Sequence, residues 1–312
     1  TRSTALLLLP DAAAGEASAG SLLPEAATAQ LPALFLQRRG ELRPLPGGVV
    51  FTEADLRAIG WDRQPTRHLA GLLWQRADLR ALSPYQTSGD VRDPAMFFGR
   101  DAELRELCAG RCRALLVIGP RKVGKSSLLK RAAAQLSARG HRAPYIVLRE
   151  TVRTPGDLVG ALARLEGQPQ PQVSPQSERG QVEALGCLIR RHLAGGMLLL
   201  DEADEFLAAD SARGGICSQE LRALVQEGVC SLAIAGYDRL YRAALSQSET
   251  AYNLGELLFL GPLERPAAIR LATEPLNRIG VQWQQPELAA HLVDQLGARP
   301  DLIQDAGRLL LL

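Results

Sequence analysis

Gly119-Pro120-Arg121-Lys122-Val123-Gly124-Lys125-Ser126 decides the fold, because it follows an apolar run at 114–118 and precedes a helical pattern at 125–136. The glycines let the backbone curl so that its N–H groups point at phosphate oxygens, and the positive end of the next helix adds to that anion site. Lys125 is expected to reach the β- and γ-phosphates, and the Ser126 hydroxyl to bind Mg²⁺. We therefore predict a phosphate-binding loop (P-loop) over these residues, with Ser127 completing the nucleotide contacts.

A second motif supplies carboxylates. The apolar run 197–200 ends in Asp201 and Glu202, downstream of the loop. In enzymes that transfer phosphoryl groups, an acid at a strand end holds Mg²⁺, and an adjacent acid can orient the attacking water. We predict that Asp201 binds the metal together with Ser126, and that Glu202 activates water. The nearby acids that compete for these roles are Asp204 and Glu205.

A family resemblance extends beyond these motifs. Phe97-Phe98-Gly99-Arg100-Asp101-Ala102-Glu103 resembles the hydrophobic-hydrophobic-Gly-Arg-Glu-x-Glu element before the P-loop of STAND ATPases, signal-transducing relatives of the AAA+ class. Asp101 departs from the usual glutamate. The resemblance implies that Arg100 lies near the nucleotide and couples its state to the arrangement of domains, whereas the alternative is a surface turn that caps a helix. It covers about residues 84–312, and its other matching segments are Tyr252-Asn253-Leu254, Leu260-Gly261-Pro262-Leu263 and Asp301-Leu302-Ile303-Gln304.

The same resemblance assigns two more residues. The family often places a polar sensor of the γ-phosphate where this chain has Gly236-Tyr237-Asp238-Arg239, and Arg239 is our candidate because a guanidinium can bind phosphate bidentately. An arginine on a helix surface is the alternative. The family's lid carries Gly-x-Pro, whose proline packs near the adenine. Pro300 matches that proline, while the glycine is replaced by Ala298 or displaced to Gly297, and a proline that starts a helix is the alternative.

Strands that alternate with helices predict the overall organisation. We expect an α/β fold: a P-loop NTPase core with a parallel five-stranded sheet, then a small helical lid, and a separate N-terminal α+β segment. The predicted divisions are 1–83 (accessory or effector-linked segment), 84–96 (linker), 97–262 (core) and 263–312 (lid). The predicted core strands are 114–118, 145–148, 197–200, 231–235 and 256–260. The other predictions are a strand at 5–9, a hairpin over 34–45, a helix at 66–82, a flexible insertion at 168–180 and lid helices at 266–279, 286–296 and 301–311.

The amino-acid composition bears on which classes of partner we expect for this chain. Thirty-six basic and 34 acidic residues leave a net charge of +2, which does not indicate a nucleic-acid surface. No apolar run approaches the roughly 20 residues that cross a bilayer. We therefore expect no membrane contact. Five scattered cysteines are typical of reduced thiols, so we also expect a cytoplasmic location. Because the chain opens on Thr1, we also expect it to be a piece of something longer.

These motifs predict a switch that binds ATP or ADP with Mg²⁺ and hydrolyses ATP slowly, as STAND proteins do in signalling and defence. Effector or sensor domains outside this chain would detect the nucleotide state, and a nucleotide-dependent homo-oligomer is one form of assembly that fits. The alternatives are an AAA+ motor or loader acting on protein or nucleic acid, and a scaffold that holds ADP without hydrolysis.

Overall fold

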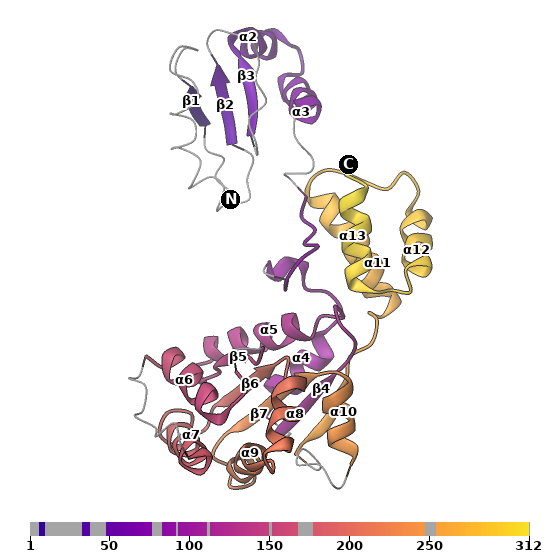
Figure 1. Cartoon of the computed structure of the whole chain (residues 1–312). Helices are drawn as coiled ribbons and strands as arrows, with labels where there is room; N and C mark the ends of the chain where they lie inside the picture. Colours follow the sequence, from indigo (N-terminus) through magenta and orange to yellow (C-terminus); the bar gives the residue numbers. More distant parts are fainter. Residues whose placement is uncertain are drawn as a thin grey trace. The chain divides into compact units, whose positions relative to one another are not determined.

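The computed structural model describes residues 6–9, 33–37, 48–76, 83–91, 93–110, 113–149, 152–167, 177–246 and 254–311. It divides into two units, which are treated separately below (Figure 1). The first comprises Thr1–Tyr85, Pro275–Gln282 and Asp305–Leu312, and the second comprises Gln86–Glu274 and Trp283–Gln304. Within the described ranges, no helix is both long and apolar enough to span a bilayer.

The N-terminal residues form a small sheet with two helices. Its strands run parallel in the order β1-β2-β3, and the elements are β1 (Leu6–Leu9), β2 (Ala33–Gln37), β3 (Gly48–Thr52), α2 (Glu53–Trp61) and α3 (Pro65–Arg76). The first helix begins with a capping box, in which Thr52 and Asp55 each bond to the other's backbone N–H. Arg76 then ties α3 to both neighbours, because it pairs with Asp55 and donates to the Val50 carbonyl.

This N-terminal segment bears on three predictions. The predicted strand at 5–9 is confirmed as β1. For the predicted hairpin over 34–45, the second strand lies outside the described residues, and β2 pairs in parallel with both β1 and β3. The described part of the predicted helix at 66–82 is α3, which begins at Pro65.

The second unit is built on the predicted five-stranded parallel sheet. Its order is β5-β6-β7-β4-β8, and the strands are β4 (Ala114–Ile118), β5 (Tyr145–Val147), β6 (Met197–Asp201), β7 (Ser231–Gly236) and β8 (Glu256–Phe259). Because all pairs are parallel, the carboxyl ends of the strands meet at one edge, where ligands bind in open α/β sheets. The loop 119–124 and the acids at 201–202 both follow strand ends and therefore meet at this edge.

Helices cover both faces of this sheet (Figure 1). Side chains of β4 alternate between two buried clusters: Leu116 and Ile118 face one, and Leu115 and Val117 face the other. The cluster with Leu115 takes in α4 (Asp101–Cys108) and α5 (Lys125–Ala138). The other takes in α6 (Pro155–Leu165), α7 (Glu178–His192), α8 (Asp204–Ala212), α9 (Ile216–Gln226) and α10 (Asp238–Leu245).

The flexible insertion predicted at 168–180 extends too far at its C-terminal end. Residues 178–180 form the first turn of α7, because the Ser177 hydroxyl caps the helix by accepting from the Gly180 N–H. The Gln, Pro and Ser composition concealed that cap. Residues 168–176 lie outside the described part of the chain.

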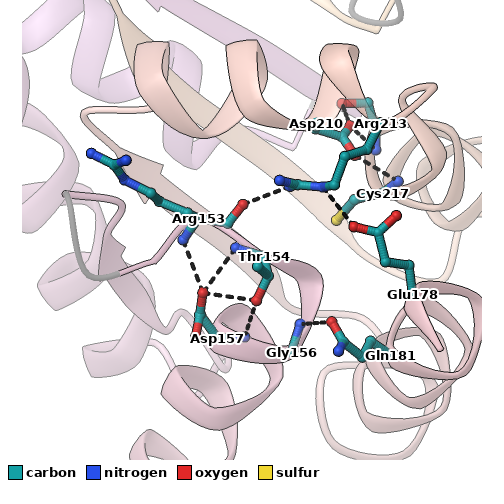
Figure 2. A network of polar contacts seen from close by, with 10 residues as sticks. Arg153, Thr154, Gly156, Asp157, Glu178, Gln181, Asp210, Arg213 and Cys217 are labelled. Carbon is teal, nitrogen blue, oxygen red and sulfur yellow. Dashed lines mark hydrogen bonds and ion pairs between the residues drawn. The ribbon is translucent and has the colours of Figure 1, made fainter. Parts of the chain in front are cut away.

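Polar contacts join the ends of the helices on the α6–α9 side (Figure 2). Arg213 donates to the Arg153 carbonyl at 2.6 Å and pairs with Glu178 at 2.8 Å. Asp210, fully buried, accepts from the backbone N–H of Cys217 and from the N–H and hydroxyl of Ser218. One carboxylate therefore caps α9, and one guanidinium links the loop before α6 to the start of α7.

Three helices follow the sheet: α11 (Arg265–Arg278), α12 (Pro286–Gln295) and α13 (Pro300–Leu309). These are the helices that the sequence predicts for the lid, each displaced by a residue or two at its ends. Arg265 of α11 forms a bidentate ion pair with Asp294 of α12, at 2.8 and 2.9 Å. The backbone N–H of Leu263 donates to the Ala298 carbonyl, which fixes the entry to α11 against the turn before α13.

Candidate functional site

The loop between β4 and α5 has the backbone that its glycines predict. A Cβ at Gly119 would collide with the carbonyl oxygen of Leu260, so the close approach of these two segments requires glycine. Gly124 has φ +101°, and Lys122 also lies in the left-handed region at φ +65°. Left-handed residues within a tight loop turn successive N–H groups toward one concave side. The segment therefore curls into an anion-binding shape directly before α5.

Lys125, the first residue of α5, closes this loop. Its ammonium donates to the carbonyls of Gly119 and Pro120 at 2.6 and 2.8 Å. Burial lowers the pKa of Lys125, while three carboxylates close by, Asp201, Asp204 and Glu202, oppose that shift. The lysine therefore faces the acidic edge of the sheet.

Asp201 ends β6 and is almost completely buried at 1% exposure. One carboxylate oxygen accepts from the Tyr145 hydroxyl at 2.6 Å, and the other accepts from the Glu202 N–H at 2.9 Å. Burial is the larger cause that raises the pKa of Tyr145 above its usual value, and the negative charge of the adjacent Asp201 raises it further. The hydroxyl therefore keeps its proton. Ser126 also interacts with this hydroxyl and opposes part of that shift. The structure thus brings the two predicted metal ligands, Ser126 and Asp201, to one tyrosine.

Glu202 leaves the strand with φ +55°, a conformation that non-glycine residues rarely adopt. Its carboxylate makes a bidentate ion pair with Arg149, at 2.9 and 3.2 Å. This hydrogen bond raises the pKa of Arg149. Sequence reasoning missed Arg149, although its position just after β5, at the same edge as Asp201 and Glu202, was a signal for it.

The rival acids have other partners. Asp204 accepts from the backbone N–H groups of Tyr237, Arg239 and Leu240 at 2.9–3.1 Å, which caps the start of α10. Glu205 lies 3.7 Å from the guanidinium of Arg239, and both side chains are exposed. The predicted sensor, Arg239, therefore sits at the first turn of α10 with its side chain directed to Glu205.

Arg100 lies behind the loop and is 6% exposed. Its guanidinium donates to the carbonyl of Val123 at 3.3 Å, to the carbonyl of Gly261, and to Glu103 at 3.0 Å. One side chain thus joins the P-loop to the segment that enters the helical region. Arg100 is also the N-cap residue of α4, so the alternative of a turn that starts a helix fits the backbone, while its side chain is buried.

Pro300 is the first residue of α13. The turn before it places Ala298 at φ +53°, the left-handed region that favours glycine. Gly297 is left-handed as well, at φ +60°, so the backbone fits either alternative: a glycine replaced by Ala298, two residues before Pro300, or one displaced to Gly297. Of the segments that carried the resemblance, Tyr252 and Asn253 lie outside the described residues.

The donor set suits a nucleotide with Mg²⁺. A hydroxyl and a carboxylate are the hard oxygen ligands that Mg²⁺ prefers, and this ion commonly takes only one or two protein ligands beside phosphates and water. The described residues contain no cluster of three or more His, Cys, Asp or Glu side chains that could hold a metal by themselves. A separate open hollow of about 470 Å³, bordered by Arg113 and Glu256, lies at the opposite edge of the strands.

A curled loop between a strand and a helix, with a lysine facing a buried strand-end aspartate on a five-stranded parallel sheet, defines a P-loop NTPase. The family model described as Novel STAND NTPase 1 matches residues 80–312. The chain therefore belongs to the Novel STAND NTPase 1 family, which confirms the resemblance seen in its motifs.

Two solved structures and one further protein are also similar to this chain. A Walker-type ATPase of Pyrococcus abyssi has a TM-score of 0.51 at 17% identity, over 72% of this chain and 70% of that chain, which shows the fold alone. The Orc1 protein of Aeropyrum pernix, solved in complex with DNA, has a TM-score of 0.48 at 24% identity, over 69% of this chain and 61% of that one. The DNA repair protein RadA of Brucella abortus (strain 2308) is 40% identical over 76 residues, which are 23% of this chain and 16% of RadA.

Proposed function

We propose that this chain binds ATP with Mg²⁺ at the 119–127 loop, hydrolyses it slowly, and acts as a switch whose nucleotide state alters the helical region. The observation that carries the proposal is the position of Lys125, held in the curled loop and facing the carboxylate of Asp201. In this function the Lys125 ammonium exchanges the carbonyls of Gly119 and Pro120 for phosphate oxygens. Ser126 and Asp201 would hold Mg²⁺, which would neutralise negative charge on the phosphates.

The ion pair between Glu202 and Arg149 supports slow hydrolysis. Both oxygens of Glu202 accept from one guanidinium, which fixes the direction of the carboxylate and fills one acceptor position on each oxygen. An attacking water therefore competes with Arg149 for this carboxylate, which restrains turnover. A restrained turnover is in keeping with a switch that stays loaded.

The contacts of Arg100 support coupling to the helical region. They join the Val123 carbonyl of the loop to the Gly261 carbonyl, two residues before the Leu263 N–H that bonds Ala298. A shift of the loop on nucleotide exchange would reach the turn before Pro300 by this path. Effector or sensor domains outside this chain, or further copies of it, are the partners that would respond, and we place this activity in the cytoplasm.

The test is a pair of substitutions. Lys125→Ala should abolish ATP binding, because it removes the phosphate-binding ammonium, whereas Glu202→Gln should keep binding and slow phosphate release. Calorimetric titration and a phosphate-release assay measure the two effects. Tight ATP binding by Lys125→Ala would refute the site.

Identifying the nucleotide that co-purifies with the wild-type chain separates the switch from a scaffold. ADP together with no measurable phosphate release would support the scaffold that holds ADP. Exchangeable ATP with slow release supports the switch.

A further inference from the structure

Tyr145 occupies a place that the P-loop motif does not account for. It is the first residue of β5 and pairs in parallel register with Leu199 of β6, so Asp201 lies two residues farther along the same face of the sheet. The tyrosine is long enough to span that offset, and its hydroxyl reaches the buried Asp201 carboxylate at 2.6 Å.

This hydroxyl joins the two predicted metal ligands. It donates to the Asp201 carboxylate at 2.6 Å, and Ser126 of α5 interacts with it. A carboxylate has about four acceptor positions. In Asp201, Tyr145 and the Glu202 N–H fill one on each oxygen, so both oxygens are fixed in direction and keep acceptor capacity for a cation or its water.

The ring of Tyr145 contacts a lysine that is paired with a residue of the segment 84–96. The Lys130 ammonium lies 5.3 Å from the ring centroid, within the range of a cation–π contact, and pairs with Asp90 at 2.7 Å. The next residue, Val91, donates its N–H to the Ser127 hydroxyl at 3.0 Å. Residues 90 and 91 are therefore fastened to the first turns of α5, beside Ser126.

We propose that Tyr145 is a positioning residue for the Mg²⁺ of this site, and that Lys130, paired with the linker residue Asp90, holds the tyrosine in place. The proposal rests on the proposed function, because it concerns the cation that accompanies the nucleotide. Without the hydroxyl, Asp201 and Ser126 lose their common partner and must be ordered when the cation binds. Partners of this kind typically change metal affinity by about 10- to 100-fold.

The experiment compares Tyr145→Phe with the wild-type full chain. A fluorescent ATP analogue is bound without metal, in EDTA, and then across a titration of Mg²⁺; Mn²⁺, followed by its EPR spectrum, reports metal binding directly. We expect the metal-free affinity to stay unchanged and the Mg²⁺ midpoint to rise about 10-fold. The matched control is Tyr241→Phe, whose ring packs against Phe259 on the surface, and its midpoint should equal that of the wild type.

A second variant acts outside the core. Lys130 is 41% exposed, so Lys130→Gln should fold even if Tyr145→Phe does not, and it should raise the Mg²⁺ midpoint about two- to fivefold through the lost cation–π contact. A wild-type midpoint in a folded Tyr145→Phe overturns the proposal. If that variant does not fold, a wild-type midpoint in Lys130→Gln overturns it instead.

Failure of the proposed function has a different signature. If the wild-type chain does not bind the analogue at any Mg²⁺ concentration, or Lys125→Ala binds it equally well, both proposals are wrong. If Lys125→Ala abolishes binding while Tyr145→Phe keeps the wild-type midpoint, only the role of Tyr145 is wrong.

Discussion

Arg149 is the residue that most directly affects whether Glu202 can act. The pair is exposed, with 71% of the Arg149 side chain and 45% of the Glu202 side chain accessible to solvent, and surface ion pairs of this kind open readily. Such a pair slows a reaction that needs the carboxylate by at most about fivefold. It is a restraint on turnover and not a block.

Arg149→Gln should therefore increase the rate of phosphate release, by up to about fivefold, with unchanged affinity for ATP. Steady-state phosphate release and calorimetric titration measure the two quantities. Arg190→Gln is the matched control. Arg190 is likewise a surface arginine paired with glutamate, in its case Glu220 and Glu227, but it lies at the end of α7. A rate that falls or stays constant in Arg149→Gln would contradict an inhibitory pair.

Ala298 carries a conformational cost that a glycine would not. A left-handed alanine costs about 1–2 kcal/mol, part of which is offset because alanine loses less backbone entropy than glycine on folding. Ala298→Gly should therefore stabilise the chain by about 0.5–1 kcal/mol, measured as a higher midpoint of thermal unfolding. The control Ala289→Gly, at a buried position inside α12, should lower it. A lower midpoint for Ala298→Gly would show that the Cβ makes a favourable contact.

Among the elements, α9 depends on a single carboxylate. Asp210 is fully buried and accepts three hydrogen bonds from the first turn of this helix (Figure 2). Asp210→Ala should lower the free energy of unfolding by about 2–3 kcal/mol, because it leaves these donors without an acceptor. Urea unfolding measures this loss. Asp238→Ala, at an exposed position in the first turn of α10, should change it by less than about 0.5 kcal/mol. Similar losses in both variants would contradict a capping role.

Sequence reasoning located the five core strands, α5 and the three helices after the sheet, but not α4, α8 or α10. The five core strands are short apolar runs bounded by turns, so their positions follow from pattern alone. By contrast, α8 and α10 are short, and α10 is capped by Asp204, which lies 33 residues earlier than Tyr237. A cap supplied from so far away leaves no local signal.

In the functional site, too, local motifs could be predicted from the sequence, whereas residues placed by a neighbouring strand could not. The loop from Gly119 to Ser126 and the acids after β6 are local motifs, and the structure brings them to one edge. Arg149 and Tyr145 are parts of no motif, since each acts through a neighbouring strand, and only the register of β5 against β6 places them there.

At the scale of the molecule, Arg100 is the side chain that connects the loop to the entry of the helical region. Arg100→Lys should keep ATP binding but remove the difference in hydrogen exchange between ATP- and ADP-bound chains over residues 261–304. A single ammonium lacks the planar fork that here serves two carbonyls and a carboxylate. Hydrogen exchange followed by mass spectrometry measures this difference, with exposed Arg105→Lys as the control. A preserved difference in Arg100→Lys would show that the coupling runs elsewhere.

Burial separates these side chains into two groups with different genetic consequences. Glu202 and Arg149 are reached by solvent, so substitutions there should yield well-expressed proteins with altered turnover. Arg100 and Asp201 are enclosed, at 6% and 1% exposure. Truncating either one to alanine leaves its hydrogen-bonding partners without a counterpart, unlike the conservative Arg100→Lys. A mutational screen would therefore detect such truncations as low protein abundance before any defect in chemistry became visible.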